Sequence, residues 1–247
     1  MFNIRFDGRL LPDFIKVKNV GFSVLPAVNH SFKQIAGGGH VKTANINLGA
    51  KIFNIEVVVV KDSNKSLTEM CRELSVWCIG NNFNLSPLVF LDDPNVMYQA
   101  VVSNNVEIND IIVAGEGNIQ MTVPNGIAIG GEKMVMSVSG SAKCVYNGTA
   151  PSFPCIEIFP ATTLSNYTLT FTNSATGEQF AITGNINYNE SITIDCAKKV
   201  VKRGNSLDLK MIKLESDWIK FSNAGTYTIT CNHVGIPYSV TYKENYY

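Results

Sequence analysis

The stretch Cys144-Val145-Tyr146-Asn147-Gly148-Thr149-Ala150-Pro151-Ser152-Phe153-Pro154 separates two parts of the chain that differ in character. Asn147-Gly148 is a turn dipeptide, because both residues tolerate positive φ. Pro151 and Pro154 each lock φ, remove a backbone donor and push the preceding residue towards extended geometry. We therefore interpret the stretch as the connector between two packed domains, residues 1–140 and 141–247.

Length and composition agree with two domains of β-sheet. A chain of 247 residues with 45% hydrophobic residues can bury a substantial core. Twenty basic residues balance twenty acidic ones, so the net charge gives no support to a general nucleic-acid or membrane-surface binder. No apolar run is long enough for a membrane span, and Met1 to Asp7 lacks the apolar core of a signal peptide. We expect synthesis in a cytoplasm and no membrane partner.

The first 60 residues predict strands and one glycine loop. Asp7-Gly8 lies between two apolar segments, which is typical of a β-hairpin. The segment from Pro26 to Gly37-Gly38-Gly39 has little periodicity, and three glycines favour a protruding loop over a phosphate-binding loop, since no GKS/T motif follows. Alternation over residues 44–48 and, after a break at Gly49, over residues 53–59 predicts a long strand that is buried on one face and, at its end, on both.

Residues 66–79 carry the clearest helix signal. Ser66-Leu67-Thr68-Glu69 is a capping box, and Gly80 suits the position after the helix. The apolar residues recur at steps of three and four, so they share one face: Leu67, Met70, Cys71, Leu74, Trp77 and Cys78. We interpret Cys71 and Cys78 as small core residues, in preference to a redox pair.

The part after the connector reads almost entirely as short strands. Apolar residues alternate with polar ones around Tyr167 to Phe171, Ile192 to Cys196, Tyr227 to Cys231 and Tyr238 to Tyr242, with turn signals between them. This spacing predicts a β-sandwich or jelly roll, and the whole chain is expected to be mainly β.

The chain carries no catalytic motif that we recognise. GxSxG, HExxH, Walker A and GxGxxG after a strand are all missing, and neither the six cysteines nor the three histidines have metal-ligand spacing. We expect no enzyme activity, no metal and no cofactor. Without a secretion signal the six cysteines are expected to be reduced.

Four motifs in order resemble the distal tail proteins of long-tailed, non-contractile bacteriophages. They are the opening Phe6-Asp7-Gly8 with Leu11, Phe14, Ile15 and Val17; the glycine loop leading into Ile52-Phe53-Asn54-Ile55-Glu56-Val57; the connector 147–154; and Ser216-Asp217-Trp218-Ile219-Lys220-Phe221 with Gly225. Each motif alone is weak, but their order and approximate spacing are similar over the whole chain. The family often carries an arginine in the strand after the loop. In this chain Lys51 is the basic residue nearest to that position.

The resemblance implies a structural hub at the tail tip of a virion, assembled in the cytoplasm of the bacterial host or encoded by a prophage. The N-terminal β domain with one helix, 66–79, would close into a homo-hexameric ring, and the C-terminal domain would be a galectin-like β-sandwich. Its implied partners are the tail tube protein, a tail-tip or tail-associated protein and a receptor-binding protein, with DNA only in transit. An extended receptor-binding arm or an added carbohydrate-binding module is not evident.

Two sets of candidate site residues follow. For the ring interface we name the loop and the strand after it: Gly37, Gly38, Gly39, His40, Lys51 and Phe53. The alternative function is binding of host-surface carbohydrate, because galectin-like sandwiches bind sugars, and Trp218 is the candidate stacking residue. Its flanking alternation places Trp218 as readily in the core. An enzyme is the third and weakest reading.

Overall fold

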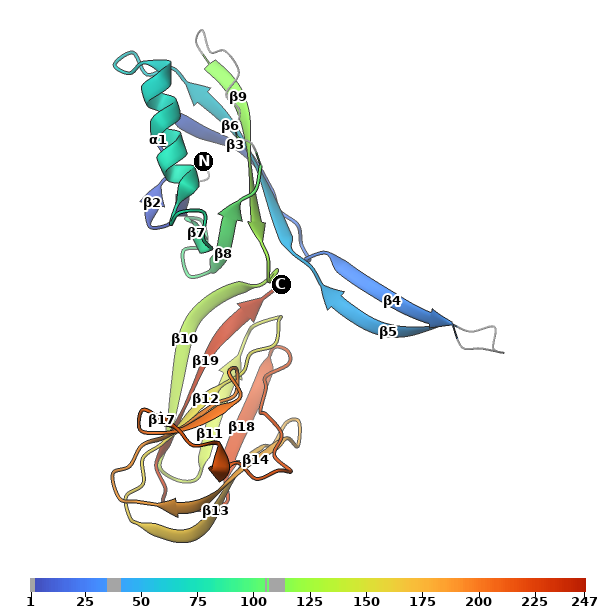
Figure 1. The fold of residues 1–247 in the computed structure, drawn as a ribbon, viewed down its shortest axis with the longest axis vertical. Coiled ribbons are helices and arrows are strands. Elements are labelled where there is room, and N and C mark those ends of the chain that lie inside the picture. The colour runs from blue at the N-terminus through green and yellow to red at the C-terminus, as the bar shows by residue number, and fades with distance from the viewer. Residues whose placement is uncertain (1–2, 35–40, 105, 107–113) are drawn as a thin grey trace. The chain divides into compact units, whose positions relative to one another are not determined.

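The computed structural model describes residues 3–34, 41–104, 106 and 114–247 (Figure 1). The chain forms two compact units, unit 1 from residue 1 to Ile129 together with Tyr247, and unit 2 from Gly130 to Tyr246. The sequence placed the change between residues 140 and 141. The boundary between the compact units lies about ten residues earlier, because residues from Gly130 onward continue in a strand that pairs within unit 2. Whether the two parts fold independently stays a prediction.

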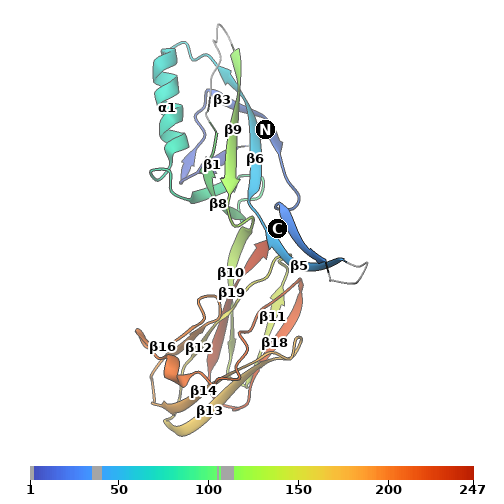
Figure 2. The ribbon, with the colours of Figure 1, turned by 45° about the vertical axis from the view of Figure 1, so that its right-hand side comes forward.

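Unit 1 is an antiparallel sheet with one helix packed against it (Figures 1 and 2). Its sheet runs in the order β3-β6-β9-β8-β7-β1-β2, and the first two residues of β10 pair with β8. The elements are β1 Ile4–Phe6, β2 Arg9–Leu10, β3 Ile15–Gly21, β4 Val28–Gln34, β5 Val41–Leu48, β6 Lys51–Val60, α1 Leu67–Ile79, β7 Ser86–Phe90, β8 Met97–Val102 and β9 Ala114–Val123.

The local predictions for unit 1 are largely confirmed. Asp7 and Gly8 have φ of 50° and 75°, so they form the tight turn between β1 and β2. Strand β6 alternates buried and exposed residues along its length, as expected for one covered face. The predicted burial of both faces at the end of β6 is wrong, because Val60 is 42% exposed on the face that the core does not cover.

Helix α1 is held by the sequence features that predicted it. The side chain of Ser66 accepts from the backbone of Glu69, and the Glu69 carboxylate accepts from the backbone of Ser66, which completes the capping box. Met70 and Leu74 are buried, and Trp77 donates from Nε1 to the carbonyl of Arg9 at 3.1 Å. The helix thereby seals the core of unit 1 against β1 and β2.

Unit 2 is a β-sandwich of two antiparallel sheets. One sheet has the order β17-β16-β15-β12-β19-β10 and the other β11-β18-β13-β14. Its elements are β10 Ala128–Ser137, β11 Ser141–Tyr146, β12 Cys155–Ile158, β13 Leu164–Asn173, β14 Gln179–Ile186, β15 Ile192–Asp195, β16 Val200–Arg203, β17 Ser206–Leu207, the 3₁₀ turn Leu209–Met211, β18 Gly225–Cys231 and β19 Tyr238–Tyr246. The two inner faces share one core, with Phe171, Phe180 and Tyr238 fully buried in it.

The connector of the sequence analysis lies inside unit 2. Strand β11 continues to Tyr146, and the irregular part begins at Asn147, where the turn was expected. Ala150 and Ser152 are buried, and their backbones pair with Asn245 and Phe221. The stretch therefore crosses the sandwich instead of linking two units. Asn-Gly and proline signals mark where regular strands end, but they do not tell an exposed linker from a packed crossing.

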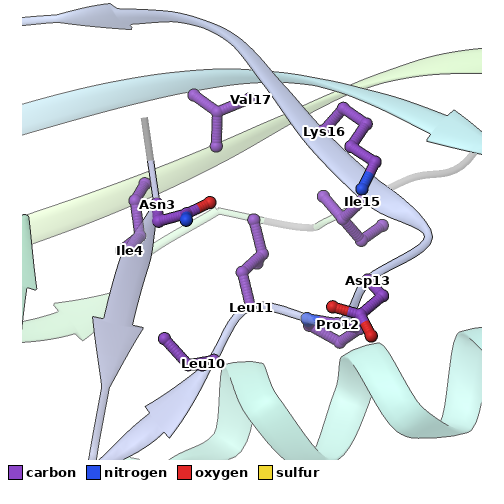
Figure 3. A pocket seen from close by; sticks show the side chains of 9 residues that line it. All are labelled: Asn3, Ile4, Leu10, Leu11, Pro12, Asp13, Ile15, Lys16 and Val17. Carbon is purple, nitrogen blue, oxygen red and sulfur yellow. The ribbon is translucent and has the colours of Figure 1, made fainter. Parts of the chain in front are cut away.

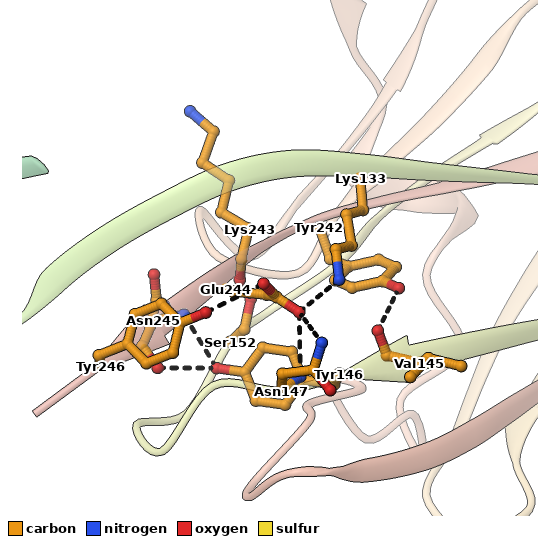
Figure 4. Close-up of polar contacts among 10 residues, drawn as sticks. All are labelled: Lys133, Val145, Tyr146, Asn147, Ser152, Tyr242, Lys243, Glu244, Asn245 and Tyr246. Carbon is orange, nitrogen blue, oxygen red and sulfur yellow. Dashed lines mark hydrogen bonds and ion pairs between the residues drawn. The ribbon is translucent and has the colours of Figure 1, made fainter. Parts of the chain in front are cut away.

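Side-chain hydrogen bonds tie this crossing to the last strand (Figure 4). The hydroxyl of Tyr146 donates to the carbonyl of Ala150 and accepts from the backbone of Asn245 at 3.1 Å. Ser152 donates from Oγ to the carbonyl of Lys243 at 2.6 Å. A β-carbon added to Gly148 would lie 2.2 Å from the Tyr146 hydroxyl, so this position requires glycine.

Candidate assembly surface

Strands β4 and β5 form a separate two-stranded arm of unit 1. They pair antiparallel from Val28 opposite Leu48 to Gln34 opposite Val41, and neither joins the larger sheet. Figures 1 and 2 show the pair leading away from the sheet of unit 1. A loop with little periodicity was expected before the glycines, and instead residues 28–34 form the first strand of the β4–β5 pair.

Close backbone contacts hold the base of the arm. The amide of Gly49 donates to the carbonyl of Ala27 at 2.6 Å, and the amide of Ala27 donates to the carbonyl of Ala50 at 3.3 Å. Gly126 has φ of +65°, and a β-carbon there would lie 2.6 Å from Cβ of Pro26 and 2.8 Å from the carbonyl oxygen of Gly49. The arm therefore leaves the sheet through a tightly packed root.

The described part of the arm and the segment leading into it expose large apolar side chains. Phe32 is 63% exposed and stacks on His30 with ring centroids 5.9 Å apart. Four more apolar residues are exposed by 40% to 84%: Val24, Leu25, Val28 and Leu48. A two-stranded hairpin is marginally stable alone in water, and its open edges favour pairing with another chain. This surface has the properties of an interface.

The candidate interface residues on β6 lie at the root of the arm and are covered. Lys51 is 4% exposed, and its Nζ lies 5.8 Å from the ring centroid of Phe53 and 5.7 Å from that of Tyr98. Burial lowers the pKa of Lys51, and no carboxylate among the described residues forms an ion pair with it. Phe53 has no exposed surface. Their part in an interface stays a prediction, while Gly37, Gly38, Gly39 and His40 lie outside the described residues.

Trp218, the candidate sugar-stacking residue, is partly buried in unit 2. Its ring packs against Phe180, with centroids 4.5 Å apart and planes tilted by 41°. Ring area that faces Phe180 is not available to a ligand, so the arrangement gives Trp218 a structural role. Its assignment to sugar binding remains untested.

Figure 3 shows one small pocket of unit 1. The pocket in Figure 3 is lined by residues between Asn3 and Val17 and holds about 90 Å³, far below the volume of most ligand sites. Within residues 3–34, 41–104, 106 and 114–247, no group of three or more His, Cys, Asp or Glu side chains could hold a metal ion. No helix in the same ranges is long and apolar enough to cross a membrane.

One known protein family is similar to unit 2. Residues 147–246 match the family model described as a siphovirus-type tail component, C-terminal domain. This region is similar to a phage tail component domain. The match covers most of unit 2, so its sandwich resembles the C-terminal domain of that family. No curated protein matches the chain.

The fold of the whole chain agrees with this assignment. The crystal structure of the Dit protein (gp 19.1) of phage SPP1, described as a paradigm of the hub adsorption apparatus in phages that infect Gram-positive bacteria, is similar over 100% of both chains, with a TM-score of 0.82 and 17% identity. Two structures of the phage p2 baseplate in its activated conformation, with Sr and with Ca, are similar over 98% of both chains, with TM-scores of 0.43 and 0.44 and identities of 7% and 8%. The resemblance to the distal tail family that the motifs indicated is confirmed.

Proposed function

We propose that the chain is the structural hub of a bacteriophage tail tip. The match of residues 147–246 to a tail component domain carries this proposal, and the similarity of the whole fold to a hub protein supports it. In this role the chain resides at the tip of the virion tail after assembly in the host cytoplasm. It joins the tail tube protein to the tail-tip and receptor-binding proteins, and it performs no catalysis.

Six copies in a closed ring would give the hub its passage for DNA. A cyclic ring is built by a heterologous interface, in which each subunit presents two different surfaces. The β4–β5 arm supplies one such surface, because its apolar side chains are exposed in the single chain. A net charge of zero also suits a passage through which DNA slides without strong phosphate binding. The second surface, on the neighbouring subunit, must be apolar and must accept the arm.

Substitution on the arm tests this arrangement. Phe32→Asp places a charge where the ring model buries an aromatic side chain, while Leu214→Asp is the matched control, because Leu214 in unit 2 is 101% exposed. Both variants should fold, since neither residue belongs to a core. We expect electron micrographs of the wild type and of Leu214→Asp to show six-fold rings, and those of Phe32→Asp to show separate subunits. If Phe32→Asp still forms rings like those of the wild type, the arm is not part of the interface.

A further inference from the structure

A shallow cavity of unit 2 has the features of a ligand site outside the proposed ring interface. It has a volume of about 290 Å³, at the lower end of the range for small-molecule sites. The loop after β12 and the turn between β14 and β15 line it, through Phe159, Pro160, Ala161, Tyr188, Asn189 and Ser191. Two segments far apart in sequence therefore build one concave surface.

Backbone hydrogen bonds hold these two segments together. The amide of Asn189 donates to the carbonyl of Pro160 at 3.1 Å, and the amide of Tyr188 donates to Oγ1 of Thr163 at 3.1 Å. The amide of Phe159 donates to the carbonyl of Pro237 at 2.9 Å. The walls of the cavity are thereby fixed to one another and to the sandwich.

The partly buried carboxylate of Glu190 stabilises the turn between β14 and β15 by hydrogen bonds. Oε2 of Glu190 accepts from the backbone and side-chain nitrogens of Asn187, each at 3.1 Å, and from Nη1 of Arg203 at 2.6 Å. The side chains of Glu190 and Arg203 are 23% and 26% exposed. A turn held in this way is ordered before any ligand arrives, which lowers the entropic cost of binding.

The side chains that this rigid frame presents are free to contact a ligand. Tyr188 is 61% exposed and Phe159 is 38% exposed, so both rings keep an open surface. Within the described part of the chain, no other side chain hydrogen-bonds the Tyr188 phenol, the Asn189 amide or the Ser191 hydroxyl. Aromatic surface beside unused donors and acceptors suits a ligand that has an apolar face and a polar edge.

We propose that this cavity binds one neutral pyranose unit of a polysaccharide. The C–H face of a pyranose stacks on an aromatic ring, and its hydroxyls exchange hydrogen bonds with amide and hydroxyl groups such as those of Asn189 and Ser191. No charged side chain lines the cavity, which favours a neutral sugar over an anionic one. Tyr188 suits this role better than Trp218, because the Trp218 ring already packs against Phe180.

Saturation-transfer NMR on the full-length protein tests the site directly. The probes are the methyl glycosides of glucose, galactose and N-acetylglucosamine. We expect transfer to at least one of them, with a dissociation constant on the order of 1 mM for so shallow a site. Tyr188→Ala should weaken binding about tenfold or more, while Tyr188→Phe, which keeps the ring, should stay within about threefold.

Two controls separate stacking from unfolding and from ring assembly. Phe83→Ala removes another exposed aromatic ring, 68% exposed and in unit 1, and should leave binding unchanged. Tyr188→Ala should keep the wild-type melting temperature and oligomeric state, so a failure of this site leaves the hub proposal intact. Absence of transfer to all three glycosides, or transfer that survives Tyr188→Ala, would overturn the assignment.

Discussion

The carboxylate of Glu244 accepts hydrogen bonds from both nitrogens of Asn147, from the backbone amide at 3.0 Å and from the side-chain amide at 2.9 Å (Figure 4). The same oxygen receives Nζ of Lys133 at 2.5 Å, and the other oxygen receives the hydroxyl of Tyr246 at 3.0 Å. The last strand of the chain is thereby bonded to the turn that the sequence identified as a connector. Stability of unit 2 should depend on this carboxylate.

Glu244 should make unit 2 sensitive to acid. Burial acts to raise the pKa of Glu244, but the hydrogen bonds from Lys133, Tyr246 and Asn147 outweigh it, and the net effect is a lowered pKa. A carboxyl whose pKa is lower in the folded state contributes stability above its unfolded pKa, about 4.3, and loses it as pH falls through the folded pKa. We expect Glu244→Gln to unfold more easily at pH 7 by about 1–3 kcal/mol and to lose less stability below pH ~4 than the wild type.

Urea titrations at several pH values measure this effect, and Glu132→Gln is the matched control. Glu132 also pairs with a lysine, Lys243 at 3.7 Å, but its side chain is 60% exposed, so its loss should change the free energy of unfolding by less than about 0.5 kcal/mol. Identical pH profiles for the wild type and Glu244→Gln would show that the network does not stabilise the fold.

Gly148→Ala should destabilise unit 2 strongly. The added β-carbon would lie 2.2 Å from the Tyr146 hydroxyl and 2.4 Å from the carbonyl oxygen of Asn245, so the crossing must shift. We expect a loss of about 1–3 kcal/mol, as for other overpacked sites. Gly131→Ala is the control, because no atom lies within 4 Å of its added β-carbon. Equal melting temperatures for the two variants would contradict the packing described for the crossing.

The thiols should be reduced and, at the core positions, unreactive in the native protein. Burial raises the pKa of Cys144 and Cys196 to about 12 and that of Cys78 to about 11, and the thiolate is the reactive form. A thiol reagent at pH 8 should therefore label these three positions only as the protein unfolds. In denaturant without reductant all six cysteines should react, and a count of two or fewer would mean that disulfides had formed.

Limited proteolysis should spare the stretch from Cys144 to Pro154. Backbone hydrogen bonds hold this stretch to two other segments. The amide of Ala150 donates to the carbonyl of Asn245 at 3.0 Å, and the amide of Ser152 donates to the carbonyl of Phe221 at 2.9 Å. A protease needs an exposed and locally unfolded segment. We expect the first cuts elsewhere in the native chain. An early cut within 144–154, mapped by mass spectrometry of the fragments, would restore the interpretation of this stretch as an exposed linker.

Local signals in the sequence predicted the local structure well. The Asp7-Gly8 turn and the capping box at Ser66 arise from contacts between near neighbours, and the alternation along β6 and β13 follows from the two-residue period of a strand with one buried face. Such contacts depend on residues that lie close together in the chain, so pattern and structure agree.

Long-range packing explains what the sequence did not reveal. The crossing at Asn147 looked like a linker because its partner, Glu244, lies 97 residues away. The arm strand β4 was missed because only Val28 and Phe32 are apolar on one face, with His30 between them, so the alternation is too sparse to predict a strand. Tyr188 gave no signal in the sequence, since its role depends on a loop from β12 that meets its turn only in the folded sandwich.

The mass of the purified full-length protein in solution tests the hub proposal most directly. Light scattering over a range of concentrations should show a particle of six subunits of 27.0 kDa, about 162 kDa, with its share rising as the protein is concentrated. A particle of 27.0 kDa at every concentration would contradict the ring on which the account rests.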